Sequence, residues 1–284
     1  MTHIPAIVIP IYNHKDTIAG VLRKLAVYGL PIFIVNDGSN AATRDVLEAL
    51  AASQPLVRLS HLPQNSGKGA AVMHGFREAF AVGCTHALQV DADGQHDLAD
   101  VPRFVEASRA HPQAIIAGRP QYDASAPASR RYGRYVTHFW VWVETLSFAI
   151  GDSMCGFRLY PLSPTVTLID RCCIPTRMDF DTEIIVRLFW MGLPVINLQT
   201  RVIYPENGLS HFRLWQDNLR ISWMHTRLCA GMLLRLPLLL WRKRFPPRLN
   251  AQHWSRQAER GSALGLRLTV LSYRLLGDTF ARLL

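Results

Sequence analysis

The signatures of two large enzyme classes are missing from this 284-residue sequence. No Gly-x-Gly-x-x-Gly follows a strand-like segment, which counts against a dinucleotide-dependent oxidoreductase. No Gly-x-x-x-x-Gly-Lys-[Ser/Thr] is present, which counts against a P-loop enzyme.

The five cysteines are an odd number without metal-ligand spacing. Together with the lack of a signal peptide, they favour a reducing, cytoplasmic compartment.

Acidic residues are scarce in the last quarter of the chain. Residues 212–284 carry 13 basic and 3 acidic side chains, whereas residues 1–211 carry 18 of each. The whole formal net charge of +10 therefore lies in the C-terminal part, and the chain divides into a neutral body and a basic tail.

An uninterrupted apolar run is also missing from this tail. The segment 221–241 is mostly apolar, but Arg227 and Arg235 interrupt it, which argues against a membrane-spanning helix. Large apolar side chains with spaced arginines favour a helix lying in the headgroup plane of an anionic membrane. A basic-faced helix packed on the body remains the alternative. Nucleic acid is disfavoured as a partner, because the apolar component is too large for a groove or a stacking platform.

The body of the chain is rich enough in apolar residues to form a large core. Hydrophobic residues make up 49% of the sequence and charged residues 18%, which excludes intrinsic disorder. Short apolar runs alternate with amphipathic stretches, which predicts an α/β fold with a mostly parallel sheet flanked by helices. The predicted strands are Ala6–Pro10, Ile32–Asn36, Val57–His61, His86–Asp91 and Ala114–Ala117. The predicted helices lie near Asp16–Ala26, Thr43–Ala51, Gly67–Phe80 and Leu98–Ala110.

Polar residues follow these predicted strands, where ligands bind in sheets of this kind. Asp37 follows the second strand and precedes Gly-Ser, so it either binds a base or ribose or caps the next helix. Lys68 stands between Gly67 and Gly69 at a predicted helix start, where it either offsets the charge of a donor phosphate or is solvated.

An Asp-x-Asp pair at the end of the fourth strand predicts a metal site. Asp91 and Asp93 would repel each other in a cleft, and a divalent cation relieves that repulsion. Gln95 adds a neutral oxygen to the same turn. Mg²⁺ favours one or two carboxylates together with substrate phosphates, which indicates a site for a metal and a diphosphate.

Taken in order, these motifs resemble the family 2 glycosyltransferases with the GT-A fold. The resemblance covers about residues 4 to 205 and is carried by Pro10-Ile-Tyr-Asn13, Asn36-Asp-Gly-Ser39, Asn65-Ser-Gly-Lys-Gly69, Asp91-Ala-Asp-Gly-Gln-His96 and Gly118-Arg119. Two further segments, Cys155-Gly-Phe-Arg-Leu-Tyr160 and Phe180-Asp-Thr-Glu-Ile-Ile185, resemble the polyprenyl-phosphate-sugar branch, which includes the dolichyl-phosphate mannose synthases.

The resemblance implies a role for each matching position. The donor, a UDP- or GDP-hexose, would be bound by Pro10, Tyr12, Asp37 and Asp91, with Asp91, Asp93 and Gln95 holding Mg²⁺ or Mn²⁺ against its diphosphate. The anionic headgroup of a membrane lipid acceptor would be met by Arg119, Arg131 and Arg134, since guanidinium groups pair with phosphate in a bidentate manner.

The chemistry implied is inverting transfer of a sugar. A phosphate acceptor is already anionic and needs no general base, whereas a hydroxyl acceptor needs one. Asp181 or Glu183 is the candidate base, unless both merely favour the start of a helix. Two other functions stay open: a sugar-phosphate nucleotidyltransferase and a non-catalytic sugar-nucleotide-binding membrane module.

The chain is predicted to divide into three parts. Residues 1–211 form the catalytic domain, residues 212–247 amphipathic helices on the membrane surface, and residues 248–284 a basic tail. The tail resembles the opening segment of the lipid A biosynthesis acyltransferases, which indicates a remnant of a fused acyltransferase or the start of one; an ordinary terminal amphipathic helix is the alternative. We expect the protein to lie peripherally on the inner face of the cytoplasmic membrane.

Overall fold

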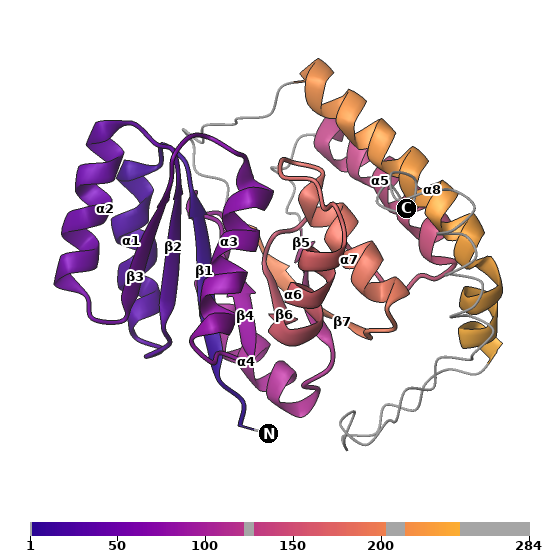
Figure 1. The fold of residues 1–284 in the computed structure, drawn as a ribbon, viewed down its shortest axis with the longest axis horizontal. Coiled ribbons are helices and arrows are strands. Elements are labelled where there is room, and N and C mark those ends of the chain that lie inside the picture. The colour runs from indigo at the N-terminus through magenta and orange to yellow at the C-terminus, as the bar shows by residue number, and fades with distance from the viewer. Residues whose placement is uncertain (1, 122–127, 203–213, 245–284) are drawn as a thin grey trace.

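A seven-stranded mixed sheet forms the centre of the molecule. The computed structural model describes residues 2–121, 128–202 and 214–244 (Figure 1). The strand order is β3-β2-β1-β4-β6-β5-β7, and every neighbouring pair is parallel except those that involve β6, which runs antiparallel to β4 and β5. The strands are β1 (Pro5–Ile11), β2 (Ile32–Asp37), β3 (Val57–Leu62), β4 (His86–Gln89), β5 (Ile115–Gln121), β6 (Arg158–Pro161) and β7 (Val195–Arg201).

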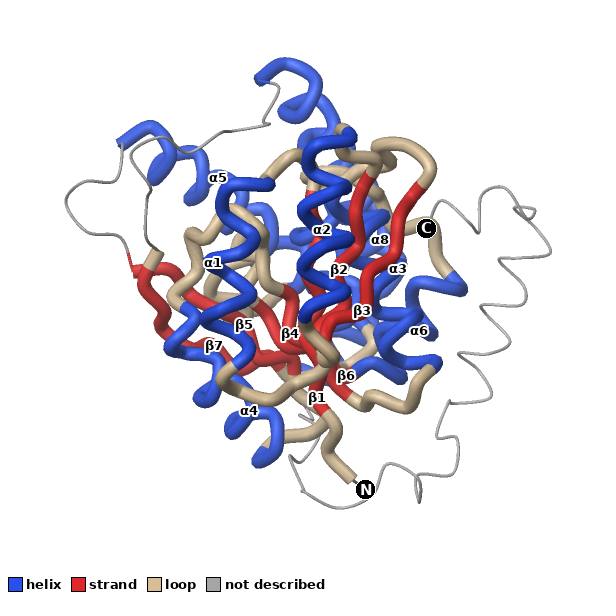
Figure 2. Tube along the Cα trace, turned by 90° about the vertical axis from the view of Figure 1, so that its left-hand side faces the viewer, coloured by secondary structure: helices blue, strands red, loops and turns tan. Residues whose placement is uncertain are grey.

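Helices cover both faces of this sheet (Figure 2). The helices are α1 (Lys15–Ala26), α2 (Ala41–Ser53), α3 (Lys68–Ala81), the short 3₁₀ helix η1 (Leu98–Asp100), α4 (Val101–Ala110), α5 (Ala128–Thr145), α6 (Leu162–Arg171), α7 (Phe180–Trp190) and α8 (Leu214–Arg244). One apolar cluster joins the sheet to α1, α2 and α4, and a second joins it to α3, α5, α6, α7 and α8.

The local sequence explains these elements. All seven residues of β1 are buried and almost all are apolar, as expected for a parallel strand covered on both faces. In α1 the buried residues Ile18, Val21, Leu22 and Leu25 recur at helical spacing and form one face. Helix α2 begins at Asn40, whose side chain accepts a hydrogen bond from the backbone N–H of Thr43 and so satisfies an otherwise unpaired donor.

The predicted fold class is confirmed, and each of the five predicted strands is present. Strand β4 ends at Gln89, two residues before the predicted end at Asp91, so the Asp-x-Asp segment lies in the turn that follows the strand. Strands β6 and β7 were missed. Strand β6 has only four residues and pairs antiparallel with both neighbours, so the pattern of alternating strands and helices does not indicate it.

Helix α8 lies beside α5 at one end of the molecule (Figure 1). It is one continuous helix of 31 residues where several helices over residues 212–247 were predicted. None of the helices in the part of the chain that the structure describes is long and apolar enough to cross a membrane. The predicted tail over residues 248–284 lies outside the described residues.

Candidate active site

The carboxyl ends of β1, β2 and β4 lie next to each other, because these three strands are parallel neighbours in the sheet. Asp37 is the last residue of β2, Asp91 follows β4 by two residues, and Lys68 is the first residue of α3. The sheet topology therefore brings together three side chains that lie far apart in the sequence, at the edge where ligands bind in such sheets.

Asp37 joins the end of β2 to the loop before α3. Its Oδ1 accepts a hydrogen bond from the backbone N–H of Ser66 at 2.7 Å, and its Oδ2 accepts one from Gly67 at 2.9 Å. Burial raises the pKa of Asp37, and the two backbone hydrogen bonds oppose that rise. Gly38 adopts φ +66°, and a Cβ there would lie 2.5 Å from the backbone N of Asn65, so the two loops pack closely. Both oxygens of Asp37 thus hold the loop, and its contact with a nucleoside stays a prediction.

Lys68 forms the centre of a charged cluster. Its Nζ lies 2.9 Å from both carboxylate oxygens of Asp91 and 2.9 Å from Oδ2 of Asp181. Burial alone would lower the pKa of Lys68, but the carboxylates of Asp181 and Asp91 outweigh burial and raise it. Burial alone would raise the pKa of Asp91, but the charge of Lys68, followed by that of His96, lowers it. The cluster therefore holds one ammonium between two carboxylates.

Neighbouring polar groups hold Asp181 in this cluster. The side-chain amide of Gln89 donates a hydrogen bond of 2.9 Å to Oδ1 of Asp181, and the Arg158 guanidinium donates to the backbone oxygen of the same residue. Gly156 lies directly against the cluster: a Cβ at this position would be 2.7 Å from Nζ of Lys68 and 3.0 Å from Oδ2 of Asp91. The backbone at Gly156 therefore lies closer to the cluster than it could if the residue carried a Cβ.

The turn after β4 offers further oxygens. The Oδ1 of Asp93 accepts a hydrogen bond from the backbone N–H of Gln95 at 3.0 Å, which leaves the second carboxylate oxygen for other partners. Although both oxygens of Asp91 lie near Lys68, only Oδ2 accepts a hydrogen bond from it. The Oδ1 of Asp91 is buried and accepts none among the described residues.

This donor set fits a divalent cation. Two carboxylates and the amide oxygen of Gln95 lie in one short turn. The buried Oδ1 of Asp91 lies 2.9 Å from Nζ of Lys68 but accepts no hydrogen bond, so it would be available as a ligand for Mg²⁺ or Mn²⁺. In the described part of the chain, no group of three or more histidine, cysteine, aspartate or glutamate side chains is arranged to hold a metal by itself. A cation bound here would need the oxygens of a substrate diphosphate to complete its coordination.

The predicted acceptor arginines lie in two places. Arg119 is exposed on β5, and Arg131 lies in α5 with its side chain outside the described residues. The Nε and Nη2 atoms of Arg134 donate hydrogen bonds of 2.5 and 3.0 Å to Asp152. Burial would raise the pKa of Asp152, but hydrogen bonds from His138 and Arg134 lower it far below its ordinary range. The Arg134 guanidinium is thus anchored by a buried carboxylate.

Asp152 is a site residue that the sequence did not reveal. Its Oδ1 also accepts hydrogen bonds from the backbone N–H groups of Met154 and Cys155, and it lies just before the Cys155-Gly-Phe-Arg segment that carries the family resemblance. The only sequence signal for Asp152 was its position three residues before Cys155, at the start of that segment. Gln89 and Arg158 were missed because nothing in the sequence shows that they contact Asp181, which lies far away along the chain.

Glu183 lies on the side of α7 that faces α8. It is fully buried, with one oxygen 2.7 Å from Nη2 of Arg187 and the other 2.8 Å from Nη2 of Arg227. Burial raises its pKa, and the charges of the two arginines oppose the rise. Of the two predicted bases, only Asp181 lies with Lys68 and Asp91.

The remaining predicted donor residues belong to the first strand and the turn after it. Pro10 is buried within β1, and Tyr12 is partly buried directly after the strand ends. This places Tyr12 at the carboxyl edge of the sheet, next to the end of β2.

Comparisons with known proteins support an assignment. The sequence model described as glycosyl transferase family 2 matches residues 6–171. The undecaprenyl-phosphate mannosyltransferase of Micrococcus luteus is 26% identical over 208 residues, which cover 72% of this chain and 85% of that protein. The dolichyl-phosphate beta-glucosyltransferase of Dictyostelium discoideum is 26% identical over 211 residues, which cover 67% of this chain and 63% of that protein.

Solved structures share the arrangement of the sheet and helices. The glucosyl-3-phosphoglycerate synthase from Mycobacterium tuberculosis, crystallised with Mg²⁺ and UDP, superposes with a TM-score of 0.58 and covers 81% of this chain and 79% of its own. Its sequence is 13% identical, so this likeness concerns the fold alone.

Proposed function

Because the chain belongs to glycosyl transferase family 2, we propose that it transfers a hexose from a nucleotide sugar to a polyprenyl phosphate at a membrane surface, with inversion at the anomeric carbon. The observation that carries this proposal is the Lys68–Asp91–Asp181 cluster beside the turn that contains Asp93 and Gln95. Charged groups in this number, at the carboxyl edge of a parallel sheet, suit a ligand that is itself highly charged.

The donor side of the reaction needs charge stabilisation. Asp91, Asp93 and Gln95 would hold Mg²⁺ or Mn²⁺, and when bound the cation would stabilise negative charge on the nucleoside diphosphate leaving group. Lys68 adds a positive charge at the same place and keeps Asp91 ionised. The loop before α3 would form one wall of the nucleoside site, and its two backbone hydrogen bonds to Asp37 hold that loop against β2.

The acceptor side favours a phosphate over a hydroxyl. A hydroxyl acceptor would need a free general base, but one oxygen of Asp181 accepts from Gln89 and the other lies 2.9 Å from Lys68. A phosphate oxygen is already anionic and attacks without a base. Arg134, anchored by Asp152, would bind such an acceptor together with Arg119 and Arg131. The two relatives are named as transferases acting on undecaprenyl phosphate and dolichyl phosphate, which supports the same acceptor class for this chain.

Ligand-dependent thermal stabilisation tests the donor proposal. We expect the melting temperature to rise with one class of nucleoside diphosphate or nucleotide sugar, and to rise further with Mn²⁺, because ligands that bind only the folded state stabilise it. At a ligand concentration of about 100 Kd the gain is roughly 2.7 kcal/mol. Mn²⁺ alone is the control. If neither uridine nor guanosine diphosphates shift the transition, with or without the metal, the proposed activity is wrong.

The outward face of α8 supports a membrane location. Its inner face carries buried Met224 and Leu228, whereas its outer face exposes Trp215, Leu219 and Trp223, which are 87%, 73% and 59% accessible. This apolar stripe continues beyond Arg227 on the same helix. A helix on a soluble protein normally exposes polar residues on this side, so an apolar outer face supports the proposed contact with lipid.

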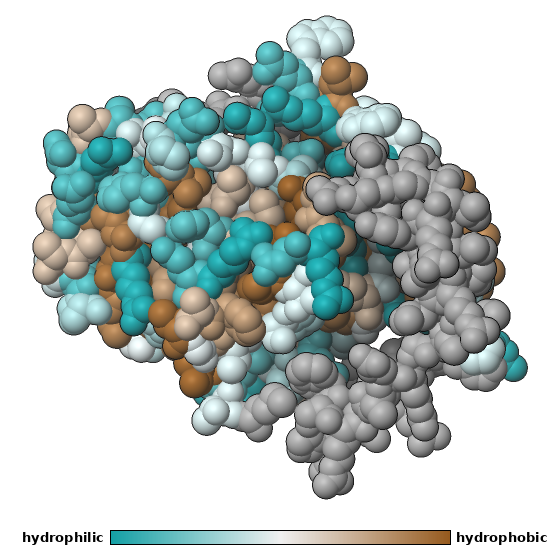
Figure 3. All heavy atoms as spheres, viewed as in Figure 1, coloured by the Kyte–Doolittle hydropathy of each residue, from teal (hydrophilic) through white to brown (hydrophobic). Residues whose placement is uncertain are grey.

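Helix α5 extends the same surface. Tyr135, Val136, Phe139 and Trp140 are exposed on it, next to α8. In the view of Figure 3, hydrophilic residues are spread widely over the half of the molecule that contains β1, β2 and β3. Among the described residues, the exposed aromatic side chains other than Phe80 lie on α5, on α8 or between α5 and β6, and α5 also carries Arg134, a predicted acceptor residue.

Vesicle sedimentation tests this membrane surface. The double variant Trp215→Ser, Trp223→Ser is expected to bind vesicles of phosphatidylglycerol and phosphatidylcholine at least about tenfold more weakly, since burying a large apolar side chain contributes roughly 1.5–3 kcal/mol. Val27→Ser is the matched control, because Val27 is 75% exposed but lies at the end of α1 on the other half of the molecule. Equal binding by the double variant and the wild type would contradict the membrane assignment.

A further inference from the structure

The loop between α5 and β6 contacts two of the predicted acceptor arginines. Arg134 of α5 donates two hydrogen bonds to the carboxylate of Asp152 in this loop. The preceding residue, Gly151, lies next to Arg119 of β5, since a Cβ at position 151 would be 3.3 Å from Cδ of that arginine. The position of this loop therefore contributes to how an arginine of the sheet and an arginine of a helix lie relative to each other.

Asn197 of β7 holds this loop with both ends of its side-chain amide. Its Nδ2 donates a hydrogen bond of 2.8 Å to the backbone oxygen of Ala149, and its Oδ1 accepts one of 2.9 Å from the backbone N–H of Gly151. In the parallel register with β5, Asn197 pairs with Ala117, two residues before Arg119. The side chains of Asn197 and Arg119 therefore project from the same face of the sheet.

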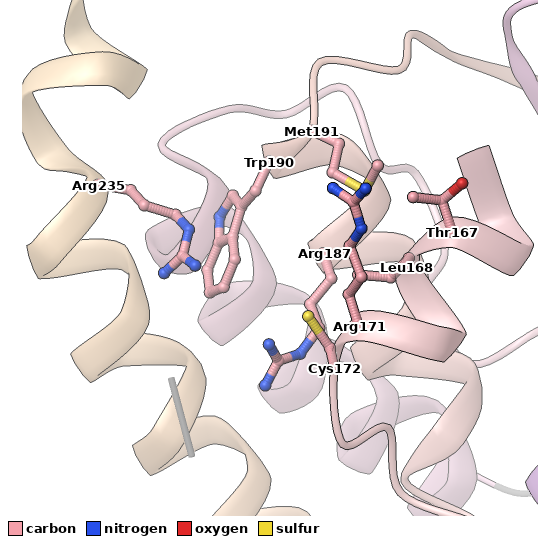
Figure 4. A pocket seen from close by; sticks show the side chains of 8 residues that line it. All are labelled: Thr167, Leu168, Arg171, Cys172, Arg187, Trp190, Met191 and Arg235. Atoms are coloured by element: carbon pink, nitrogen blue, oxygen red, sulfur yellow. The ribbon is translucent and has the colours of Figure 1, made fainter. Parts of the chain in front are cut away.

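Strand β7 is a firm support for this side chain. It pairs with β5 over seven successive residues. The helix before it, α7, is held at its end, because Nε1 of Trp190 donates a hydrogen bond of 2.9 Å to the backbone oxygen of Glu144 in α5. The guanidinium of Arg235 lies 4.8 Å from the centre of the same indole ring, and Figure 4 shows Arg235 reaching from α8 toward it. A side chain on such a strand can fix the loop to which it binds.

We propose that Asn197 is a positioning residue for the acceptor. By holding the segment 149–151 against β7, it places Asp152, and through Asp152 the guanidinium of Arg134, relative to Arg119. This inference rests on the proposed function, in which these arginines bind the phosphate of the acceptor. Asn197 acts through the loop, because both of its amide groups are bonded to the loop backbone.

Substrate kinetics test this role. Asn197→Ala is expected to raise the KM for a short-chain polyprenyl phosphate about tenfold, the scale of one or two lost hydrogen bonds. The KM for the nucleotide sugar and kcat should stay within about twofold, because a loss confined to the binding of one substrate raises the KM for that substrate alone. A merely structural role would lower the melting temperature without separating the two KM values.

Gln199→Ala is the matched control for this variant. Gln199 is an exposed amide side chain on the same strand, and its Oε1 accepts a hydrogen bond of 2.8 Å from Gln121. Its replacement should change both KM values by less than about twofold, as expected for a surface substitution. An equal rise of the acceptor KM in Asn197→Ala and Gln199→Ala would overturn the proposal, because it would reduce the effect to a general loosening of β7.

Gly151→Ala tests the same contact from the loop. Its Cβ would lie 2.8 Å from Oδ1 of Asn197, so the variant should displace the loop and raise the acceptor KM as Asn197→Ala does. When position 197 is alanine, the obstructing oxygen is gone, so adding Gly151→Ala should raise the KM less than about twofold further. Losses that multiply in the double variant would show that the two residues act separately and would contradict the proposal.

Hydrogen exchange gives a readout that needs no turnover. In Asn197→Ala the backbone amide of Gly151 loses its acceptor and should exchange faster, measured by NMR on the full chain. The backbone amides of Met154 and Cys155 donate to Oδ1 of Asp152, so they should exchange faster as well if Asn197 places that carboxylate. Faster exchange at Gly151 with no change at Met154 and Cys155 would overturn the proposal.

Arg134→Gln separates this inference from the proposed function, because it removes a predicted contact with the acceptor itself. If this variant raises the acceptor KM but Asn197→Ala does not, the positioning role alone is wrong. If it leaves the acceptor KM of an active enzyme unchanged, the acceptor site is placed wrongly and the positioning role is wrong with it. If the wild type transfers no hexose to a polyprenyl phosphate, the proposed function is wrong, and the exchange data decide whether Asn197 places Asp152.

Discussion

Replacing Asp93 with asparagine is expected to lower turnover with a nucleotide sugar by roughly a thousand-fold, the scale of removing one charge-stabilising group from an active site. Asparagine keeps the oxygen that accepts the hydrogen bond from the backbone of Gln95, so the turn itself should persist. What is lost is one of the two carboxylates that would hold the divalent cation. The additional thermal stabilisation by Mn²⁺ in the presence of nucleoside diphosphate should disappear together with turnover.

A control for this variant lies four residues further along the chain. Asp97→Asn removes the same charge from the same turn, and Asp97 likewise accepts a backbone hydrogen bond, from Ala99, at the start of η1. Asparagine is an equally good residue at a helix start, so turnover and Mn²⁺-dependent stabilisation should be nearly unchanged. If Asp93→Asn retains the turnover of Asp97→Asn, the metal site is placed wrongly.

Replacing Lys68 with methionine is expected to destabilise the fold by about 3–5 kcal/mol, the scale reported for removing one partner of a buried ion pair. The change leaves the carboxylates of Asp91 and Asp181 close together without the ammonium between them. Urea unfolding at neutral pH measures the loss. Adding Asp181→Asn should restore more than half of it, because the uncompensated charge is then removed while the oxygen that accepts from Gln89 is retained.

The pH dependence of stability provides a further check on the same ion pairs. The pKa of Asp91 is lowered on folding, so its contribution is present above its ordinary value of 3.8 and is lost as the pH falls through the lowered value. The pKa of Lys68 is raised, so its contribution is complete below 10.5 and is lost as the pH rises beyond it. Lys68→Met should therefore remove stability across the interval between these values. A variant as stable as the wild type at pH 7 would show that the cluster is not a stabilising ion pair.

The fold was predictable from the sequence in its first half because β1, β2 and β4 are buried on both faces there. β1 consists almost wholly of apolar residues, and α1 repeats them at helical spacing, so local pattern and burial agree. The second half was less predictable. Strand β6 pairs with β4 and β5, which lie far from it in the sequence. Its four residues, Arg158–Pro161, overlap the Cys155-Gly-Phe-Arg-Leu-Tyr160 motif and are too few to show an alternating strand pattern.

The candidate site divides in the same way. Asp37 ends β2, Lys68 begins α3 and Asp91 follows β4, so their place at one edge of the sheet follows from the topology. Asp181 lies in a helix whose position against α3 depends on packing over 90 residues of intervening chain. Its contact with Lys68 could only be seen once the chain was folded.

The sequence by itself determined the family, the parallel sheet and the identity of the charged residues at its edge, because those depend on local pattern and on the order of motifs. The tertiary structure alone decided how the charges pair. In the folded chain Asp181 pairs with Lys68, and Arg134 pairs with Asp152. Glu183 pairs with one arginine of α7 and one of α8. Electrostatic pairing is effective over a few ångströms, and distances of that size between remote segments are fixed by the packing of the whole core.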